Sequence, residues 1–306
     1  MLQYSSVIMM KKQLRGTLSL VLATLIWGLA FSAQSVGMDY IGPFTFQTAR
    51  CFLAVLGLLP VIALVDRADD RKALGYWARW KDSTLWKAGL LCGIPLFLAC
   101  NLQQVGLVET DAGKSGFLTA MYIVIVPVIG IFRGKKPSAA VPVSVVLAVA
   151  GLYFLSCMEA GAISTGDLLT LGCAFAFAVQ ITFVDIFAPE VDSLRLNAIQ
   201  CAVCAVLSAV VTAFTETPTW EAIADCWLPI AYAGLLSMGA AYSLQIIGQK
   251  HIEPATASLI MSLESVFAVL FGCLLLGETL TGWEIFGCVL IFIAVLLSQL
   301  PERKKK

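Results

Sequence analysis

The sequence predicts an all-α integral membrane protein whose ten transmembrane helices form two inverted five-helix repeats around a central cavity. Three observations carry this prediction. The 306-residue chain is 59% hydrophobic and 13% charged, whereas a soluble domain is about 45–50% apolar and about 25% charged. Apolar stretches of about 20 residues, the length that crosses a bilayer, recur along the chain. Two of these stretches carry matching sets of hydroxyl side chains.

The apolar stretches are separated by short polar connections, none of which could hold a soluble domain. The first stretch follows Lys11, Lys12 and Arg15, as in a signal peptide, but it continues to Val36, so we expect it to be retained as a span. The function is therefore expected within the membrane bundle. The ten expected spans cover residues 16–36, 43–65, 85–107, 112–132, 138–157, 166–187, 194–214, 227–248, 255–276 and 282–300.

The charged residues indicate how these spans are oriented. All 20 Lys and Arg residues except Arg50 and Lys114 fall on one side of the membrane under the ten-span reading, and the opposite connections are acidic. Basic residues mark the cytoplasmic side. We therefore expect a multi-pass protein of the plasma (inner) membrane with both termini in the cytoplasm.

Two hydroxyl trios predict an internal repeat. Each trio has the spacing i, i+4, i+7, which places its members on one face of a helix. The first trio is Ser115, Thr119 and Tyr122 and the second, 143 positions later, is Ser258, Ser262 and Ser265. Residues 110–156 align with 253–299 without a gap, so the expected repeats are 16–157 and 166–300. Because each has five spans, the second enters the membrane in the opposite orientation, as in many secondary transporters.

Short motifs add a resemblance to a known family. They are Leu25–Gly28 (LIWG), Arg50, Gly116–Ala120 (GFLTA), Ser262–Ala268 (SLESVFA) and Leu276–Leu280 (LGETL). In this order the chain resembles, over nearly its whole length, the EamA type of the drug/metabolite transporter (DMT) superfamily. The resemblance implies a ten-helix inner-membrane permease that moves small metabolites such as amino acids, often outward.

The sequence departs from the family pattern at two places. The family often has Pro after the intramembrane glutamate, where this chain has Ser265, which removes a potential helix kink. It also often has Glu at the position of Lys135, matching Glu278 of the second repeat. Neither departure alters the expected fold.

Polar and aromatic side chains within the spans are the candidates for substrate binding. Hydroxyls of Thr119, Tyr122 and Ser262 are expected to line the cavity, although small hydroxyl residues also pack helix interfaces. Aromatic walls with a few amides suit an organic solute with an apolar body and polar ends, and ordinary helix packing is the alternative. These aromatic and amide candidates are Trp27, Phe31, Asn101, Gln104, Phe175, Gln180, Tyr242 and Gln245.

Three charged residues lie within the expected spans. Glu264 is the carboxylate expected at mid-depth, and it is the candidate for binding a substrate amine or a coupling proton. A charge at the centre of a span is costly and marks a functional site by default. A buried ion pair between Glu264 and Arg50 would instead be purely structural. Lys114 lies near the outer boundary, where it could snorkel to the interface or attract an anion.

These features predict a secondary transporter, in the direction of export, that carries a small organic metabolite by alternating access. Membrane lipids surround it, and we expect no nucleic-acid partner, no metal and no cofactor. The chain has one histidine and lacks the HExxH, GxSxG and phosphate-loop patterns, so it is not expected to be an enzyme. The alternative is a lipid-handling membrane protein, either flippase-like or a lipid-modifying subunit, which a lateral groove open to lipid would favour.

Overall fold

A computed structural model describes residues 2–68, 76–110, 112–135, 137–156, 164–276 and 281–299. Within these ranges the chain is helical and contains no strand. Gly277 and Glu278 of the LGETL motif lie outside the described residues. The first half of the chain contains α1 (Leu2–Gly37), α2 (Pro43–Ala68), α3 (Tyr76–Trp80), α4 (Ser83–Glu109), α5 (Ala112–Ala120), α6 (Tyr122–Phe132) and α7 (Ala140–Ser156).

The second half repeats this all-helical character, with one segment of π-helix. Its elements are α8 (Thr165–Phe187), α9 (Ser193–Thr215), α10 (Trp220–Asp225), α11 (Trp227–Ala231), the π-helix η1 (Tyr232–Ala241), α12 (Tyr242–Gln249), α13 (Pro254–Met261), α14 (Leu263–Leu276) and α15 (Gly282–Ser298).

Eight helical segments of the described chain are long and apolar enough to cross a membrane. They confirm an all-α, multi-pass membrane protein. The two remaining apolar helices, α7 and α15, have 17 residues each, at the short end of what can span the hydrocarbon. The eight segments are Met10–Gly37, Pro43–Ala68, Ser83–Glu109, Lys114–Phe132, Thr165–Phe187, Ser193–Thr215, Trp227–Gln249 and Pro254–Phe271.

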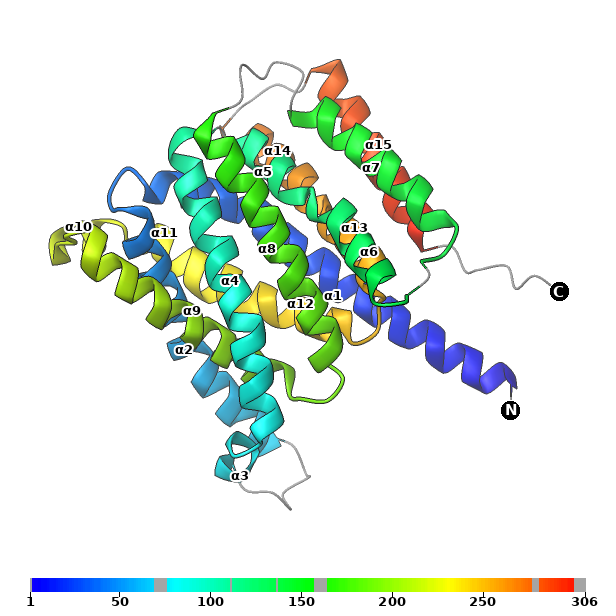
Figure 1. Ribbon diagram of the computed structural model, residues 1–306, viewed down its shortest axis with the longest axis horizontal. Helices are drawn as coiled ribbons and strands as arrows, with labels where there is room; N and C mark the ends of the chain where they lie inside the picture. Colours follow the sequence, from blue (N-terminus) through cyan, green and yellow to red (C-terminus); the bar gives the residue numbers. More distant parts are fainter. Residues whose placement is uncertain are drawn as a thin grey trace.

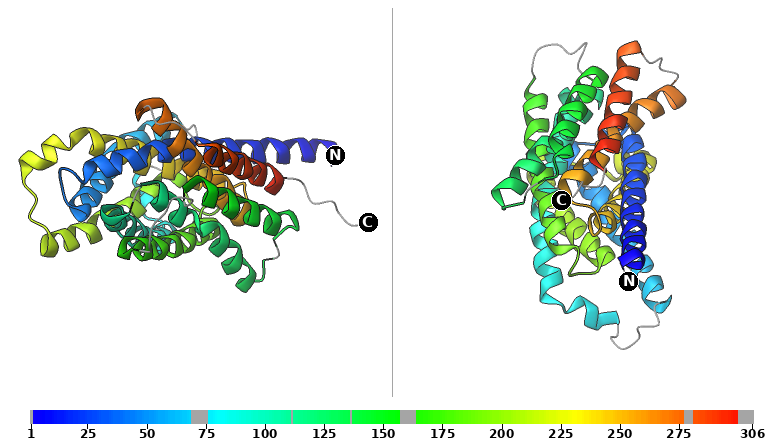
Figure 2. Two further views of the ribbon diagram at one scale, coloured as in Figure 1. Left: turned by 90° about the horizontal axis from the view of Figure 1, so that it is seen from above. Right: turned by 90° about the vertical axis from the view of Figure 1, so that its right-hand side faces the viewer.

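Helices that are distant in the sequence pack side by side. The most extensive contacts join α4 to α8, α7 to α15, α2 to α9, α4 to α9 and α1 to α14. Figure 1 shows α4 beside α8 in the middle of the bundle and α7 beside α15 at its upper right edge. The two views of Figure 2 show the same bundle from above and from one side, with α1 running along it.

Small residues allow the closest of these approaches. A Cβ atom on Gly28 of α1 would come within 2.6 Å of Phe267 Cβ on α14. Gly106 of α4 and Gly166 of α8 face each other, and a Cβ on either would come within 3.0 Å of the other's carbonyl oxygen. Small residues are typical of helix contacts in membranes because dispersion forces act only at short range.

Three spans are interrupted near their middle. The segment Lys114–Phe132 breaks at Met121, between α5 and α6, and the segment Pro254–Phe271 breaks at Ser262, between α13 and α14. The segment Trp227–Gln249 contains η1, whose π-helical turns leave backbone carbonyls at irregular positions. The side-chain amide of Asn197 on α9 donates to the carbonyls of Met238 and Gly239 at 3.0 and 2.9 Å. Irregular backbone at membrane depth requires such internal partners, because lipid offers none.

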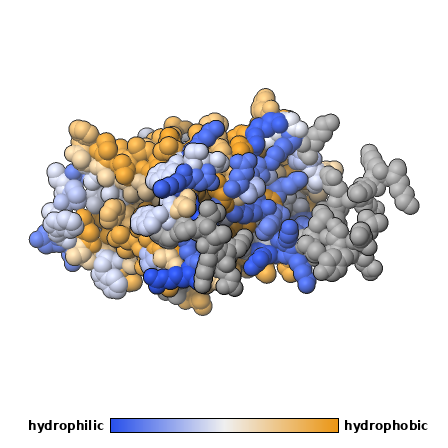
Figure 3. Space-filling model, turned by 90° about the horizontal axis from the view of Figure 1, so that it is seen from below, coloured by the Kyte–Doolittle hydropathy of each residue, from blue (hydrophilic) through white to orange (hydrophobic). Residues whose placement is uncertain are grey.

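The outer surface matches a lipid environment. Large apolar side chains point outward, and Phe132 and Phe214 are 87% and 86% exposed. A soluble monomer rarely exposes contiguous apolar surface on this scale. Figure 3 shows the face seen from below, where hydrophilic side chains gather between hydrophobic flanks. This distribution is typical of a bundle whose polar ends lie outside the bilayer.

Candidate substrate cavity

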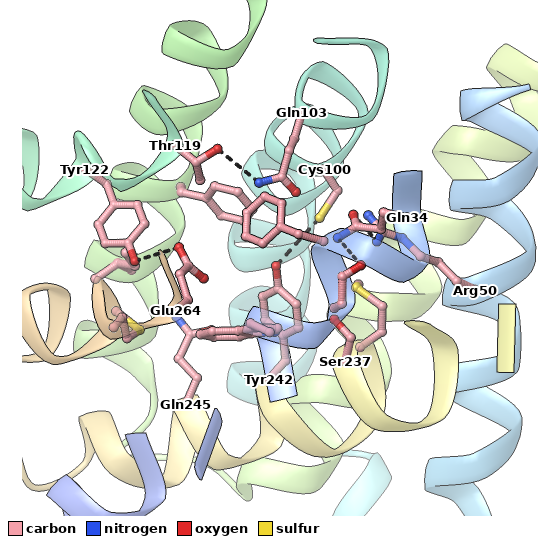
Figure 4. A pocket seen from close by; sticks show the side chains of 17 residues that line it. Gln34, Arg50, Cys100, Gln103, Thr119, Tyr122, Ser237, Tyr242, Gln245 and Glu264 are labelled. Atoms are coloured by element: carbon pink, nitrogen blue, oxygen red, sulfur yellow. Dashed lines mark hydrogen bonds between the residues drawn. The ribbon is translucent and has the colours of Figure 1, made fainter. Parts of the chain in front are cut away.

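A cavity lies inside the bundle, between helices from both halves of the chain (Figure 4). Its wall is formed by α1, α2, α4, α5, α6, α8, η1, α12, α13 and α14. The space inside it that a water-sized molecule can enter is about 50 Å³. Sites for small molecules have about 300–1,000 Å³ and a few polar groups in a largely apolar wall. The lining has the character of such a site, and in this conformation the side chains leave less room than such a site provides.

The helix α1 contributes two aromatic side chains and an amide to the wall. Trp27, Phe31 and Gln34 follow one another at i, i+4, i+7 and therefore share the face of α1 that lines the cavity. The ring of Trp27 packs edge to face against Tyr242 of α12, with ring centroids 5.0 Å apart. Rings held in this way offer a rigid apolar surface to the body of a ligand.

The two helix breaks, at Met121 and at Ser262, lie at the cavity wall. Thr119 and Tyr122 flank the break at Met121, and Met261 and Glu264 flank the break at Ser262. Broken helices at mid-membrane are a feature of transporter binding sites, because the break exposes backbone and aims side chains inward.

Hydrogen bonds hold the polar side chains of this wall in place. Tyr122 donates its hydroxyl to Glu264 Oε1 at 3.1 Å, which joins α6 to α14 across the two breaks. Gln103 of α4 donates its side-chain amide to Thr119 Oγ1 at 3.1 Å. Tyr242 Oη lies 3.7 Å from Cys100 Sγ. Each bond joins different helices, so the relative position of those helices determines the shape of the cavity.

Arg50 of α2 adds a positive charge to the wall. Its side chain is 2% exposed, and its Nε and Nη1 donate to Gln47 Oε1 at 2.6 Å and Gln34 Oε1 at 2.5 Å. The guanidinium carbon lies 5.6 Å from the centre of the Phe46 ring. Within the described residues no carboxylate lies within 4.0 Å of it, so the Arg50–Glu264 ion pair considered from the sequence does not form.

A chain of amides connects the cavity to the π-helix. Gln245 of the cavity wall donates to Gln180 Oε1 at 3.1 Å, and Gln180 donates to Gln200 Oε1 at 3.2 Å. Gln200 in turn donates to Asn197 Oδ1 at 2.8 Å. Asn197 also donates to two backbone carbonyls of η1. An unbroken series of side-chain hydrogen bonds therefore connects Gln245 to the backbone of η1.

Two polar atoms of the wall have no hydrogen-bond partner within the described chain. They are the indole Nε1 of Trp27, a donor, and the amide Oε1 of Gln245, an acceptor. Buried polar atoms are nearly always paired, because leaving one unpaired costs about 1–3 kcal/mol. The cavity therefore presents one hydrogen-bond donor and one acceptor that are available to a bound polar molecule.

The structure brings seven of the twelve predicted site residues together in this cavity. They come from α1, from α5 and α6, from α12 and from α14. On α4 and α8 other residues than the predicted ones line the cavity. The seven residues are Trp27, Phe31, Thr119, Tyr122, Tyr242, Gln245 and Glu264.

The other five predicted residues lie away from the cavity wall. Phe175 is 58% exposed on the outer surface of α8. Asn101 donates to Ser208 Oγ on α9 at 2.9 Å, and Gln104 lies behind Gln34. Gln180 lies behind Gln245, and the hydroxyl of Ser262 donates to the Leu259 carbonyl of its own helix at 2.7 Å. These positions favour packing roles for the five residues.

Sequence reasoning selected neighbouring positions on α4 and α8. On α4 the wall residues are Cys100 and Gln103, one position before the predicted Asn101 and Gln104. A shift of one residue turns a helix face by about 100°, and an all-round apolar helix gives no stripe to orient it. Gln34 was detectable, because it extends the Trp27 and Phe31 stripe by one turn.

A second hollow lies next to the cavity, along α6, α8 and α13. Val126 and Thr182 line it and lie four and five positions beyond Tyr122 and Phe177 of the cavity, toward the end that carries Arg133 and Lys135. Both of these basic side chains contact Asp185, at 3.5 and 2.6 Å. The hollow is thus a polar-rimmed depression that leads toward the cavity from one end of the bundle.

Comparison with known proteins identifies the class of protein that this bundle and cavity define. The chain matches the EamA-like transporter family over residues 14–157 and again over residues 164–300. It belongs to this family and is an EamA-type permease of the DMT superfamily, and therefore a transporter. Membership points away from an enzyme, since the family and the relatives are transporters.

Individual relatives agree with this assignment. An uncharacterized transporter of Archaeoglobus fulgidus is 33% identical over 290 residues, which cover 94% of this chain and 87% of that protein. The threonine/homoserine exporter RhtA of Escherichia coli strain K12 is 28% identical over 183 residues, 58% of this chain and 60% of RhtA. A solved crystal structure with 19% identity superimposes with a TM-score of 0.74 and covers 93% of this chain, which shows a shared fold.

Proposed function

We propose that this protein is a secondary transporter that exports a small organic metabolite, such as an amino acid, by alternating access. The observation that carries the proposal is the cavity itself. It is enclosed by helices of both halves, lined by aromatic, amide and hydroxyl side chains, and placed where two spans break. A site of this kind binds a solute at mid-depth while the two halves rock around it.

The packing pattern supports ten spans in two inverted repeats, 16–157 and 166–300. If the fifth and tenth spans are α7 and α15, the most extensive contacts have counterparts when the spans of the two repeats are exchanged. Contacts of α4 with α8 correspond to those of α1 with η1 and α12, while α2–α9 and α7–α15 correspond to themselves. The two matches to the EamA-like family cover nearly the same two ranges.

The two sides of the cavity support an inward-facing state. Toward the acidic end, Lys114 of α5 pairs with Asp167 of α8 at 2.6 Å, and Thr110 donates to the same carboxylate at 3.0 Å. Toward the basic end lies the second hollow beside Arg133 and Lys135. With basic ends in the cytoplasm of a plasma-membrane protein, the cavity is closed outside and approached from inside. That arrangement fits loading from the cytoplasm.

The coupling ion in this proposal is a proton that binds Glu264. This carboxylate is 6% exposed, and its one hydrogen bond within the described residues comes from Tyr122. In Glu264→Gln, transport should no longer respond to a pH gradient, although the protein still inserts into the membrane. A Glu264→Gln variant that responds to the gradient as the parent does would remove Glu264 from the coupling.

RhtA, whose name gives it as a threonine/homoserine exporter, supports the choice of substrate class. The test is solute counterflow in proteoliposomes, with labelled amino acids, sugars and nucleosides outside and the same unlabelled solute inside. At least one amino acid should accumulate. Thr119→Leu, which fills the cavity, should abolish accumulation, whereas Phe175→Leu on the lipid-facing surface should not. Scrambling of labelled lipid without counterflow of any solute would favour the lipid-handling alternative.

A further inference from the structure

The cavity wall contains one basic and one acidic side chain that do not pair with each other. Arg50 enters it from α2 and Glu264 from α14, on opposite sides, with Tyr242 between them in Figure 4. Arg50 is 2% and Glu264 is 6% exposed. Both line the same cavity, yet the described residues place no acidic group within 4.0 Å of Arg50 and no basic group within 4.0 Å of Glu264.

Their present partners are all uncharged. Arg50 donates to the amide oxygens of Gln47 and Gln34, and Glu264 accepts one hydrogen bond from Tyr122. These bonds orient the charged groups without cancelling their charge. An ionised side chain inside the membrane is costly, and buried charges are normally paired.

Elsewhere the same bundle pairs its buried charges. Lys114 binds Asp167 at 2.6 Å, and Arg195 binds Asp66 directly. The missing pairing in the cavity is therefore a local property of that site. A ligand that brought only an anion would leave Glu264 unpaired, and one that brought only a cation would leave Arg50 unpaired. An uncharged sugar would leave both unpaired.

We propose that the transported solute is a small zwitterion whose carboxylate binds Arg50 and whose ammonium group binds Glu264 at the same time. The two side chains lie on opposite sides of the cavity, beyond ion-pair distance, and the Tyr242 and Trp27 rings contribute an apolar surface to the same wall. The solute therefore carries a carboxylate and an ammonium group joined by a spacer that brings both within hydrogen-bond reach of these two side chains. This inference rests on the proposed transport function and specifies its substrate class.

Binding of charge-matched ligands to the full-length protein, purified in detergent, tests the proposed zwitterion site. The first series runs from glycine to 6-aminohexanoate and varies only the spacer. The second compares 5-aminopentanoate with pentylamine and pentanoate, which each retain one charge. Affinity, measured by calorimetry, should be highest at one spacer length of the first series, the length that reaches both side chains. The zwitterion should bind at least about tenfold tighter than either singly charged analogue, as expected for losing one charge-assisted bond.

Two variants assign each end of the ligand. Arg50→Gln should bind 5-aminopentanoate and pentylamine equally, and Glu264→Gln should bind 5-aminopentanoate and pentanoate equally. Asp192→Asn, a half-exposed carboxylate outside the cavity wall, should retain the selectivity of the parent. If a variant fails to fold, the ligand series on the parent still decides the outcome.

Several results would overturn the inference. They are equal binding along the whole spacer series, equal binding of a singly charged analogue, or no binding of any member of the series. If another solute then showed counterflow, the proposed transport function would be supported and only the zwitterionic substrate class would be rejected. Phosphatidylethanolamine also carries an anion and an ammonium group. Nanodiscs with and without this lipid separate the sources, and stabilisation by the lipid alone would assign the two charges to a headgroup.

Discussion

Arg50 and Arg195 are two deeply buried arginines on neighbouring helices, and their surroundings differ completely. Both are almost inaccessible, at 2% and 1% exposure, and they lie on α2 and α9, which pack against each other. Arg195 binds Asp66 and lies 3.5 Å from Asp192, with its guanidinium 5.4 Å from the centre of the Trp80 ring. Arg50 is held by two neutral amides and faces the cavity.

The contrast separates structural charge from charge available to a ligand. Arg195 ties the start of α9 to the end of α2, where Asp66 also contacts Arg79 at 2.9 Å. Its charge is balanced by carboxylates of the same chain. The charge of Arg50 is oriented but not balanced by the described residues, which is the state expected of a binding residue before its ligand arrives.

The largest effect is expected when Arg195 loses its main partner. In Asp66→Asn the buried guanidinium loses its carboxylate, and removing one partner of a buried pair costs about 3–5 kcal/mol. The free energy of unfolding, measured by titration of the purified protein with sodium dodecyl sulfate, should fall by that amount. Asp39→Asn, an exposed substitution in the loop after α1, is the control. An unchanged free energy for Asp66→Asn would mean that the Arg195 cluster does not hold the bundle together.

The same loss of charge should have unequal effects at the two arginines. Arg50→Gln leaves no described carboxylate unpaired, and the removed cost of a buried charge offsets the two lost hydrogen bonds, so its free energy of unfolding should change by no more than about 1 kcal/mol. Arg195→Gln leaves Asp66 without its buried partner and should destabilise the protein by about twice as much or more. If both variants lost the same amount of unfolding free energy in the same detergent titration, the two arginines would not differ in their structural role.

A smaller effect is expected when Arg50 keeps its charge but loses its orientation. Gln34→Leu removes the acceptor of the 2.5 Å bond from Arg50, and hydrogen bonds to charged groups contribute about 1.5–3 kcal/mol. Calorimetry should show weaker binding of carboxylate ligands and little change for amines. Gln104→Leu, directly behind Gln34, is the matched control. Equal weakening in both variants would indicate a general loss of packing.

The smallest effect is expected at the rim of the Arg195 cluster. Asp192 is 45% exposed and 3.5 Å from Arg195, and its carboxylate caps α9 by accepting from the Arg195 backbone N–H. Asp192→Asn keeps a capping oxygen, so stability should fall by no more than about 1 kcal/mol. A loss as large as that of Asp66→Asn would show that Asp192, and not Asp66, is the principal counterion of Arg195.

The sequence predicted the fold class well and the cavity wall in part, for identifiable reasons. Long apolar stretches require helices, because lipid satisfies no backbone hydrogen bond. On α1 an aromatic stripe at helical spacing identified Trp27 and Phe31 directly. On α8 the apolar residues surround the whole helix, so no stripe could distinguish the exposed Phe175 from Phe177 in the cavity wall.

By itself, the sequence determined that this chain spans a membrane repeatedly in helices and that polar side chains lie within these spans. Composition and spacing are sufficient for these points, because the bilayer restricts both span length and backbone geometry. Only the tertiary structure decided which polar groups meet. It paired Arg195 with Asp66, 129 positions away, and left Arg50 facing Glu264 across a cavity. Such pairings depend on how helices rotate and pack, and helix rotation is not encoded in hydropathy.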